Sequence, residues 1–197
     1  EGNLYLAAVP GEADGGDGEL AASVRWDSEA ATPVGPIVPG GLRRAAAVLR
    51  AALIAGAADR LTTMTADYAN QRIQFGKPIG KQQALQQQLA VMAEDMVAAR
   101  IAAHIGGAGS FPPALAAAAT AKSVASSAAA RVAAIAHAVH GAIGISGEYD
   151  LQLYTRRLQA WRLADGSESY WNRLLGAERL AAPSGSVDFV RTALAPA

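Results

Sequence analysis

The feature that most constrains the fold is a long alanine-rich stretch, residues 43–180, in which apolar residues recur every three or four positions. This spacing places the apolar side chains along one side of an α-helix. Glycine and proline interrupt the pattern near residues 76–80, 106–113 and 141–147, where helices are expected to end. Long helices with short connections predict a helical bundle, so the expected fold class is mainly α.

These three interruptions, with a further boundary between residues 163 and 167, define five expected helices. With approximate ends, these cover residues 43–72, a second stretch that ends near residue 106, and residues 113–141, 149–163 and 167–180. In the first three helices, the residues expected to face the core are Leu49, Leu53, Ala57, Leu61, Met64 and Tyr68, then Leu85, Leu89, Met92, Met96 and Ala99, then Val124, Ala128, Val132, Ile135 and Val139.

Residues 1–42 have a different character. Two short runs, Leu4–Val9 and Leu20–Trp26, are expected to be strands on either side of a loop rich in glycine and aspartate. The proline and glycine content of Pro33–Gly41 indicates a linker. Because two strands alone form only a marginal sheet, this segment is expected to be the end of a larger β-domain. The expected organisation is therefore a β segment with a linker (1–42), a helical bundle (43–182) and a loosely held tail (183–197).

The composition excludes several classes of function. The chain carries 17 Lys and Arg against 17 Asp and Glu, so it has no basic surplus for nucleic-acid binding without sequence preference. Apolar residues make up 51% and charged residues 17%, which is unlike a disordered protein. The lack of cysteine excludes disulfides, thiolate metal sites and cysteine nucleophiles, and it suits a cytoplasmic protein. No stretch of ~18 residues looks both strongly apolar and uncharged, so neither a membrane span nor a signal peptide is expected.

Common catalytic and phosphate-binding motifs are missing. The sequence has neither G-x-G-x-x-G nor a P-loop, and the G-x-S-x-G of serine hydrolases is also absent. The histidines are His104, His137 and His140, of which the last two stand three residues apart, with Glu148 further along. Because histidine needs convergent partners to hold a metal, we interpret these residues as interfacial or capping groups and expect no metal site.

The segment Tyr68–Gln83 combines aromatic residues, an arginine and several amides at the end of the first helix. In a structural interpretation, Phe75 fills a gap in the bundle, and Arg72 stabilises the carboxyl end of the helix by ~0.3–1 kcal/mol. In a functional interpretation, Arg72 binds a phosphate and Phe75 packs on a flat ring. The residues alone leave both interpretations open.

Two stretches resemble motifs of the acyl-CoA dehydrogenase family. Residues 72–83 resemble R-x-x-F-G-x-x-[IL]-x-x-x-Q, and residues 138–151 resemble Q-x-H-G-G-x-G-[FY]-x-x-E-[HY]-x-L. Both stand in the family's order, and the resemblance extends from about Glu1 to Leu180. It implies the end of the family's middle β-domain followed by its C-terminal helical bundle.

In that family the two motifs contact an FAD that is held mainly by a neighbouring subunit. The resemblance therefore implies FAD as cofactor and a dimer or tetramer, of one kind of chain or two, formed through the helical bundle. Ala138 stands where the family has Gln, and Ala142 stands where it has a second Gly. The implied cofactor-contacting positions are Arg72, Gln74, Phe75, Gln83, Ala138, Gly141, Ala142 and Ser167.

The resemblance also implies a position for the catalytic base. The family usually has a Glu in a Y-E-G-T stretch before the last helix, and Asp165 stands at that position. The base removes the α-proton of an acyl-CoA thioester while the flavin takes the β-hydrogen as hydride. Some members place the base on the first helix of this domain, where the present chain has Ala46. From the residues alone, Asp165–Glu168 also has the D-x-x-E spacing of a helix-capping box.

The resemblance predicts part of a flavin-dependent acyl-CoA dehydrogenase that passes electrons to a separate acceptor. One alternative is a non-catalytic partner that lends Arg72 and Phe75 to a flavin site on another subunit. Another is a helical oligomerisation module without flavin. The departures at Ala138, Ala142 and Asp165 favour the partner role for this chain, and the enzyme for the complex that contains it.

Overall fold

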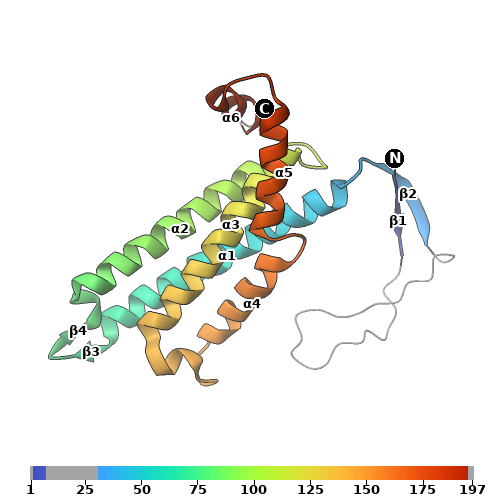
Figure 1. Cartoon of the computed structure of the whole chain (residues 1–197). Coiled ribbons are helices and arrows are strands. Elements are labelled where there is room, and N and C mark those ends of the chain that lie inside the picture. The colour runs from blue at the N-terminus through green and yellow to red at the C-terminus, as the bar shows by residue number, and fades with distance from the viewer. Residues whose placement is uncertain (1, 8–30, 195–197) are drawn as a thin grey trace. The chain divides into compact units, whose positions relative to one another are not determined.

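The computed structural model describes residues 2–7 and 31–194 of the chain. The chain divides into two compact units, Glu1–Leu42 and Arg43–Ala197, and each is described by itself. Figure 1 shows the elements of both units. The described part is mainly helical, as the sequence predicts.

In the described residues of the first unit, β1 (Gly2–Leu6) and β2 (Thr32–Ile37) form an antiparallel pair of strands. Gly2 pairs with Ile37 and Leu6 with Thr32, and the register is irregular between Leu4 and Tyr5. The strand predicted at residues 20–26 lies outside the described residues. The prediction of a linker from residue 33 was wrong for its first half, because β2 includes both Pro33 and Pro36. A strand that pairs on one side only can contain proline, since its outward N–H groups need no partner.

The second unit is the helical bundle. Its three longest helices are α1 (Gly41–Gln71), α2 (Gln83–Gly107) and α3 (Leu115–His140). A short hairpin, β3 (Ile73–Gln74) with β4 (Lys77–Pro78), and the 3₁₀ turn η1 (Ile79–Lys81) join α1 to α2. After α3 come the 3₁₀ turn η2 (Gly141–Ile145), α4 (Leu151–Leu163), α5 (Glu168–Ala181) and α6 (Ser186–Ala193). The five predicted helices are therefore confirmed, with ends that differ by a few residues.

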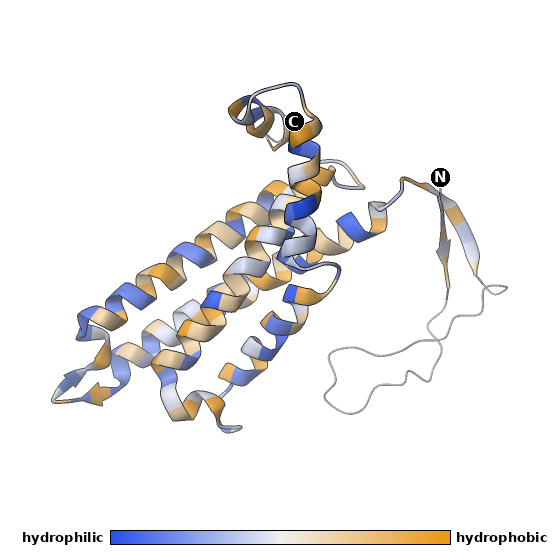
Figure 2. Cartoon of the chain, in the orientation of Figure 1, coloured by the Kyte–Doolittle hydropathy of each residue, from blue (hydrophilic) through white to orange (hydrophobic). Residues whose placement is uncertain are grey.

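Helix α3 is the centre of the bundle, because it packs against α2, α4 and α5. Small side chains make this close packing possible. A Cβ on Gly106 of α2 would lie only 2.7 Å from the Cβ of Ala121 on α3 and 3.0 Å from a methyl group of Val48 on α1. Figure 2 shows that apolar residues recur along these helices. The alanine-rich composition is therefore what allows α1, α2 and α3 to approach one another closely.

The apolar composition of α3 follows from this central position. No membrane span was expected, yet by length and composition residues 115–145 would suffice to cross a membrane even though they include Lys122 and Arg131. In the bundle, however, α3 is a core helix that also contains the fully buried Lys122 and Ser126. An apolar core helix passes the same composition test as a membrane span.

The predicted core faces were right for α2 and α3 and wrong for the first part of α1. Met92 and Ala99 of α2 are buried, as are Ala128, Val132 and Val139 of α3. On α1, however, Leu49 is 67% exposed and Leu53 is 46% exposed. Ala47, Ala51, Ile54 and Ala58 are buried in their place. Alanine occupies the tight contact, so the larger leucines of this part of α1 project outward.

The prediction of a loose tail after residue 183 is also corrected. Residues Ser186–Ala193 form α6, and Phe189 on this helix is buried. The guanidinium of Arg179 on α5 lies 5.8 Å from the centre of the Phe189 ring, and its Nε donates a hydrogen bond of 3.1 Å to Ser186. One aromatic anchor and these two contacts hold α6 against α5.

Candidate functional site

The segment 72–83 forms an exposed hairpin at one end of the bundle. Gln74 pairs with Lys77, and the turn between them has positive φ angles at Phe75 (52°) and Gly76 (77°). Two successive positive φ angles are typical of the type I′ turn, whose twist suits a short hairpin. The turn leaves the Phe75 side chain 93% exposed, so the interpretation of Phe75 as a filler of the bundle was wrong. Arg72 and Gln74 are also exposed.

The base of the hairpin is tied to the end of α3. Ile79 is buried in a cluster with Ala69 of α1 and Val139 of α3. The backbone N–H of Ile79 donates a 2.9 Å hydrogen bond to the carbonyl of Arg72, which closes the hairpin. Figure 1 shows the hairpin and the α3–η2 junction at the same end of the bundle. The two motifs, whose first residues are 66 positions apart in sequence (138 − 72), therefore meet there.

The residues predicted to contact a cofactor on the second motif are exposed. Ala138, Gly141 and Ala142 all lie on the surface where α3 passes into η2. Gly141 has a φ of +62° and ends α3, and its N–H donates a hydrogen bond to the carbonyl of His137. A Cβ on Gly141 would meet nothing within 4 Å, so the surface above it is open. Gln83, at the start of α2, is exposed as well.

The histidines near this junction support the fold. His140 is buried, stacks on Tyr68 with 4.4 Å between ring centres, and places Nδ1 2.8 Å from the carbonyl oxygen of Ala136. Burial lowers the pKa of His140, so its ring stays neutral at pH 7. The Nε2 atom of His137 lies 3.0 Å from the hydroxyl of Thr155 on α4. Within residues 2–7 and 31–194, no group of three or more His, Asp and Glu could hold a metal ion.

Asp165 lies in a second region, the turn between α4 and α5. Its backbone has a φ of 59°, and Gly166 follows with a φ of 107°. One carboxylate oxygen of Asp165 accepts a 3.0 Å hydrogen bond from Nε of Arg50 on α1, and this ion pair is about one-third exposed (36% and 30%). The indole N–H of Trp171 donates a 3.2 Å hydrogen bond to the backbone carbonyl of Asp165.

The alternative role of Asp165 as a helix cap was wrong. The N-cap of α5 is Ser167, whose side chain makes no capping hydrogen bond. Glu168, expected to reach back in a capping box, instead accepts hydrogen bonds from Arg162 on α4. That charged pairing lowers the pKa of Glu168. The Asp165 side chain is thus directed at α1 and does not satisfy the end of α5.

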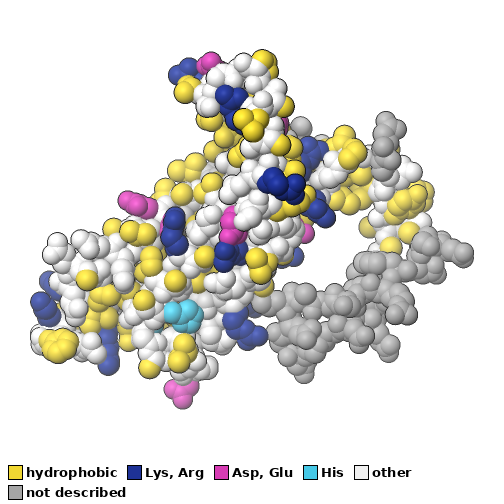
Figure 3. Space-filling view, in the orientation of Figure 1, with side chains coloured by type: hydrophobic (Ala, Val, Ile, Leu, Met, Phe, Trp, Pro, Cys, Tyr) yellow, Lys and Arg dark blue, Asp and Glu magenta, His cyan; other side chains and the backbone are white. Residues whose placement is uncertain are grey.

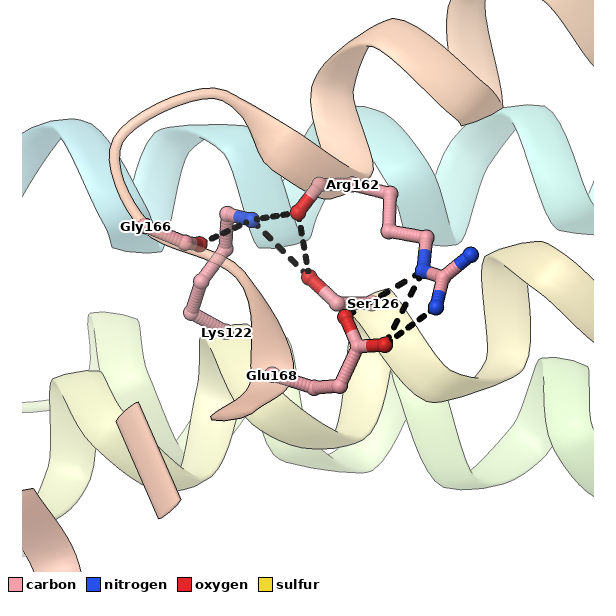
Figure 4. Close-up of polar contacts among 5 residues, drawn as sticks. All are labelled: Lys122, Ser126, Arg162, Gly166 and Glu168. Atoms are coloured by element: carbon pink, nitrogen blue, oxygen red, sulfur yellow. Dashed lines mark hydrogen bonds and ion pairs between the residues drawn. The ribbon is translucent and has the colours of Figure 1, made fainter. Parts of the chain in front are cut away.

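A buried lysine lies directly behind this turn. The Nζ atom of Lys122 donates hydrogen bonds to Oγ of Ser126 (2.8 Å), the carbonyl of Arg162 (2.8 Å) and the carbonyl of Gly166 (2.9 Å). Figure 4 shows these contacts converging on the Lys122 ammonium group. Burial lowers the pKa of Lys122 from 10.5 to about 8, against the opposing effect of the nearby Asp165 and Glu168 carboxylates.

The two regions are well separated. Arg50, which contacts Asp165, and Gln71, beside Arg72, are 21 residues apart on α1. At 1.5 Å per residue this is roughly 30 Å. Ser167 was one of the implied cofactor-contacting positions, together with the hairpin residues. It lies at the α4–α5 turn with Asp165 and not at the hairpin. Ala46, the position of the alternative base, lies one turn before Arg50 on α1.

Sequence reasoning missed Arg50, Lys122 and Ser126. One signal was available, because Lys122 is one of only two Lys or Arg residues, with Arg131, in the otherwise apolar and alanine-rich helix α3. Figure 3 shows that the visible face of the bundle carries hydrophobic side chains with charged ones scattered between them. Nothing in the sequence distinguishes Arg50 from the other arginines of α1.

These features define a class of protein: an α-helical bundle with an exposed hairpin after its first long helix and a glycine-containing turn at the same end. The family model of the acyl-CoA dehydrogenase C-terminal domain matches residues 43–181, and the chain therefore belongs to the acyl-CoA dehydrogenase family. The predicted family and the predicted C-terminal helical bundle are both confirmed.

Two curated relatives are similar in sequence. The chain is 35% identical over 159 residues to acyl-CoA dehydrogenase IpdE2 of Mycolicibacterium smegmatis, covering 72% of this chain and 50% of that protein. It is 38% identical over 134 residues to acyl-CoA dehydrogenase IpdE2 of Mycobacterium tuberculosis, covering 68% of this chain and 40% of that protein. The chain thus spans half or less of the length of these relatives.

Solved structures share the fold. A glutaryl-coenzyme A dehydrogenase in complex with glutaryl-CoA superimposes with a TM-score of 0.71 at 27% identity, over 89% of this chain and 43% of that chain. A chain of the ChsE4–ChsE5 complex from Mycobacterium tuberculosis superimposes with a TM-score of 0.68 at 27% identity, over 83% of this chain and 45% of that chain.

Proposed function

We propose that this chain is part of a flavin-dependent acyl-CoA dehydrogenase that α,β-dehydrogenates an acyl-CoA thioester, and that it contributes to an FAD site shared between subunits. The observation that carries the proposal is the meeting of the two motif segments at one end of the bundle, both with exposed side chains. A surface that binds a cofactor held by another subunit has to be exposed in the isolated chain.

The residues at this end fit the adenosine diphosphate part of FAD. Arg72 offers a guanidinium, which matches phosphate oxygens with two parallel hydrogen bonds. Phe75 offers a free aromatic face for a flat ring. The open backbone at Gly141 allows close approach, with Ala138 and Ala142 beside it, and Gln74 and Gln83 supply amides at the hairpin. Ala138 and Ala142 stand where the family motif has Gln and Gly, so most of the FAD contacts are expected to come from the hairpin.

Asp165 is the proposed base for the α-proton of the thioester, with Ser167 next to it. FAD, when bound, supplies the acceptor for the β-hydrogen and its electron pair. Asp165 takes the α-proton onto its carboxylate as the Cα–H bond breaks, which leaves the carbon–carbon double bond in the product. One oxygen of this carboxylate faces Arg50, which orients the group toward α1.

A second candidate function is that of a non-catalytic partner subunit. The pairing of Asp165 with Arg50 favours it, because one oxygen of the carboxylate already accepts a hydrogen bond from the guanidinium and only the other is left for a substrate proton. In either role the chain acts in an oligomer with a separate electron acceptor. The similarity to a chain of the ChsE4–ChsE5 complex supports an assembly of unlike subunits.

Absorbance and mass analysis of the native complex test the proposal. We expect a flavin spectrum, FAD on denaturation, and this chain together with its partner. Arg72→Ala should reduce the FAD retained after gel filtration at least tenfold, whereas Arg100→Ala, an exposed arginine on α2, should leave it unchanged. A complex without flavin excludes both candidate functions, and equal retention by the two variants excludes the role of Arg72.

Turnover of Asp165→Asn distinguishes the two candidates. Asn keeps the shape of the side chain but cannot take up a proton, so we expect kcat to fall by ~100-fold or more if Asp165 is the base. Unchanged turnover in a complex with full FAD content would assign the chain to the non-catalytic role.

A further inference from the structure

The turn that carries Asp165 is held from behind by a single buried ammonium group. Lys122 is fully buried, and its three N–H donors match the three oxygen acceptors contributed by Ser126, Arg162 and Gly166. An ammonium group has three donors and no acceptor, so its hydrogen-bonding capacity is used completely. No donor is left for a substrate or cofactor, which indicates a structural purpose for Lys122.

The two backbone acceptors lie on either side of Asp165. The Arg162 carbonyl belongs to the last turn of α4, where helix carbonyls lack partners within the helix. The Gly166 carbonyl comes directly after Asp165. Oγ of Ser126 lies 3.2 Å from the Arg162 carbonyl and donates to it as well. Residues 163–165 are therefore bridged to α3 at both ends.

The backbone of this turn needs such support. Asp165 is one of two non-glycine residues in the described part of the chain with a positive φ, and such conformations persist only where their surroundings determine them. Lys122 and Ser126 fix the backbone from α3, Trp171 holds the Asp165 carbonyl from α5, and Arg50 holds the carboxylate from α1. Figure 4 shows the α3 part of this arrangement.

We propose that Lys122 and Ser126 are positioning residues for Asp165: they fix the α4–α5 turn so that the carboxylate is presented at a set place beside Arg50. This rests on the proposed role of Asp165 as the base. Misplacement of a reacting group by about 1 Å can lower a rate by about 100-fold. A loss of either anchor should therefore reduce turnover more than it changes binding.

The test uses the complete FAD-containing complex and two matched serines on α3. Ser126→Ala removes one acceptor of Lys122 and one donor to the Arg162 carbonyl, whereas Ser123→Ala removes another buried hydroxyl, whose hydrogen bond goes to the Thr120 carbonyl within α3. We expect Ser126→Ala to lower kcat by about tenfold or more with KM and FAD content unchanged, following the rate cost of misplacement. Ser123→Ala should keep kcat within about twofold of the wild type, because it leaves the turn anchored.

Combination with Asp165→Asn separates positioning from general loss of structure. If Ser126 acts through Asp165, Ser126→Ala lowers kcat in the wild type but lowers it no further in the Asp165→Asn background. Equal loss in both backgrounds, or equal loss with Ser123→Ala, overturns the positioning role while the proposed function stands. Wild-type turnover by Asp165→Asn overturns Asp165 as the base, and the positioning role with it. Lys122→Met, if it folds, should exceed the effect of Ser126→Ala and show the same dependence on Asp165.

Discussion

The hairpin end and the α4–α5 turn are both candidate functional regions, yet they are held in opposite ways. The hairpin is fixed by backbone pairing and by the buried Ile79 at its base, and Phe75 and Arg72 remain exposed. The turn is fixed by hydrogen bonds, since the buried Lys122 holds it from behind and Arg50 and Trp171 bond to Asp165. A surface that receives a cofactor from another subunit needs to be open, whereas a reacting carboxylate needs a set position.

The largest expected effect on stability comes from comparing alanine substitutions at two glycines with positive φ, Gly166 in the turn and Gly76 in the hairpin. A Cβ on Gly166 would lie 2.6 Å from the Tyr170 ring and 2.8 Å from Nε1 of Trp171, whereas a Cβ on Gly76 would meet nothing within 4 Å. Gly166→Ala combines backbone strain with overpacking and should cost about 3 kcal/mol or more of unfolding free energy. Gly76→Ala should cost only about 1 kcal/mol, from backbone strain alone.

Urea unfolding of the two variants measures the difference directly. Similar losses in both would mean that the turn is no more tightly held than the hairpin. The comparison between the two regions would then fail.

The helices could be predicted from the sequence because glycine and proline mark their ends clearly. The buried face of α1 could not, since alanine carries little hydrophobic signal and the larger Leu49 and Leu53 dominated the pattern. Burial of Ala51 and Ala58 depends on how closely α2 and α3 approach, which only the packed bundle determines.

The hairpin residues of the candidate site followed from a motif, since they are contiguous in sequence. The surroundings of Asp165 did not, because its partners come from distant parts of the chain. Arg50 lies 115 residues away in sequence, and Lys122 is 44 residues from the Gly166 carbonyl that it binds. The D-x-x-E spacing predicted a capping box, but Asp165 and Glu168 instead bind Arg50 and Arg162, which come from other helices.

As the pH falls, contacts that hold the α4–α5 turn should lose stability at a higher pH than those of the hairpin. The hydrogen bonds from Arg162 lower the pKa of Glu168, so this pair stabilises the fold above the unfolded-state value of about 4.3. The contribution, about 1 kcal/mol for a partly exposed pair, is lost as the pH falls through the lower, folded-state pKa. Glu168→Gln should therefore be less stable than the wild type at pH 7 and equally stable at the acid end.

Unfolding free energies of both proteins between pH 7 and pH 3 check this. Glu94→Gln, an exposed carboxylate on α2, serves as the control and should run parallel to the wild type. A constant gap between Glu168→Gln and the wild type across the whole range would show that the ion pair contributes nothing to the pH dependence.

The Arg50–Asp165 ion pair should contribute little to the unfolding free energy, although it orients the Asp165 carboxylate. Because both side chains are about one-third exposed (36% and 30%), water screens their attraction. Arg50→Gln should therefore cost only about 0.5 kcal/mol in urea unfolding. A loss above about 2 kcal/mol would place the pair among buried ion pairs, and the turn would then owe its stability to Arg50 as much as to Lys122.

The smallest expected effect on stability belongs to the hairpin tip. Phe75 is 93% exposed, so Phe75→Ala should change the unfolding free energy by less than about 0.5 kcal/mol. Ile79→Ala, at the buried base of the same hairpin, should cost about 2 kcal/mol or more. In the complete complex, Phe75→Ala should nevertheless retain less FAD after gel filtration, because the exposed ring is there to contact the cofactor. If Phe75→Ala has normal stability and also retains FAD normally, the Phe75 ring has no role in binding FAD. The hairpin could then not be described as an open recognition surface in contrast to the anchored α4–α5 turn.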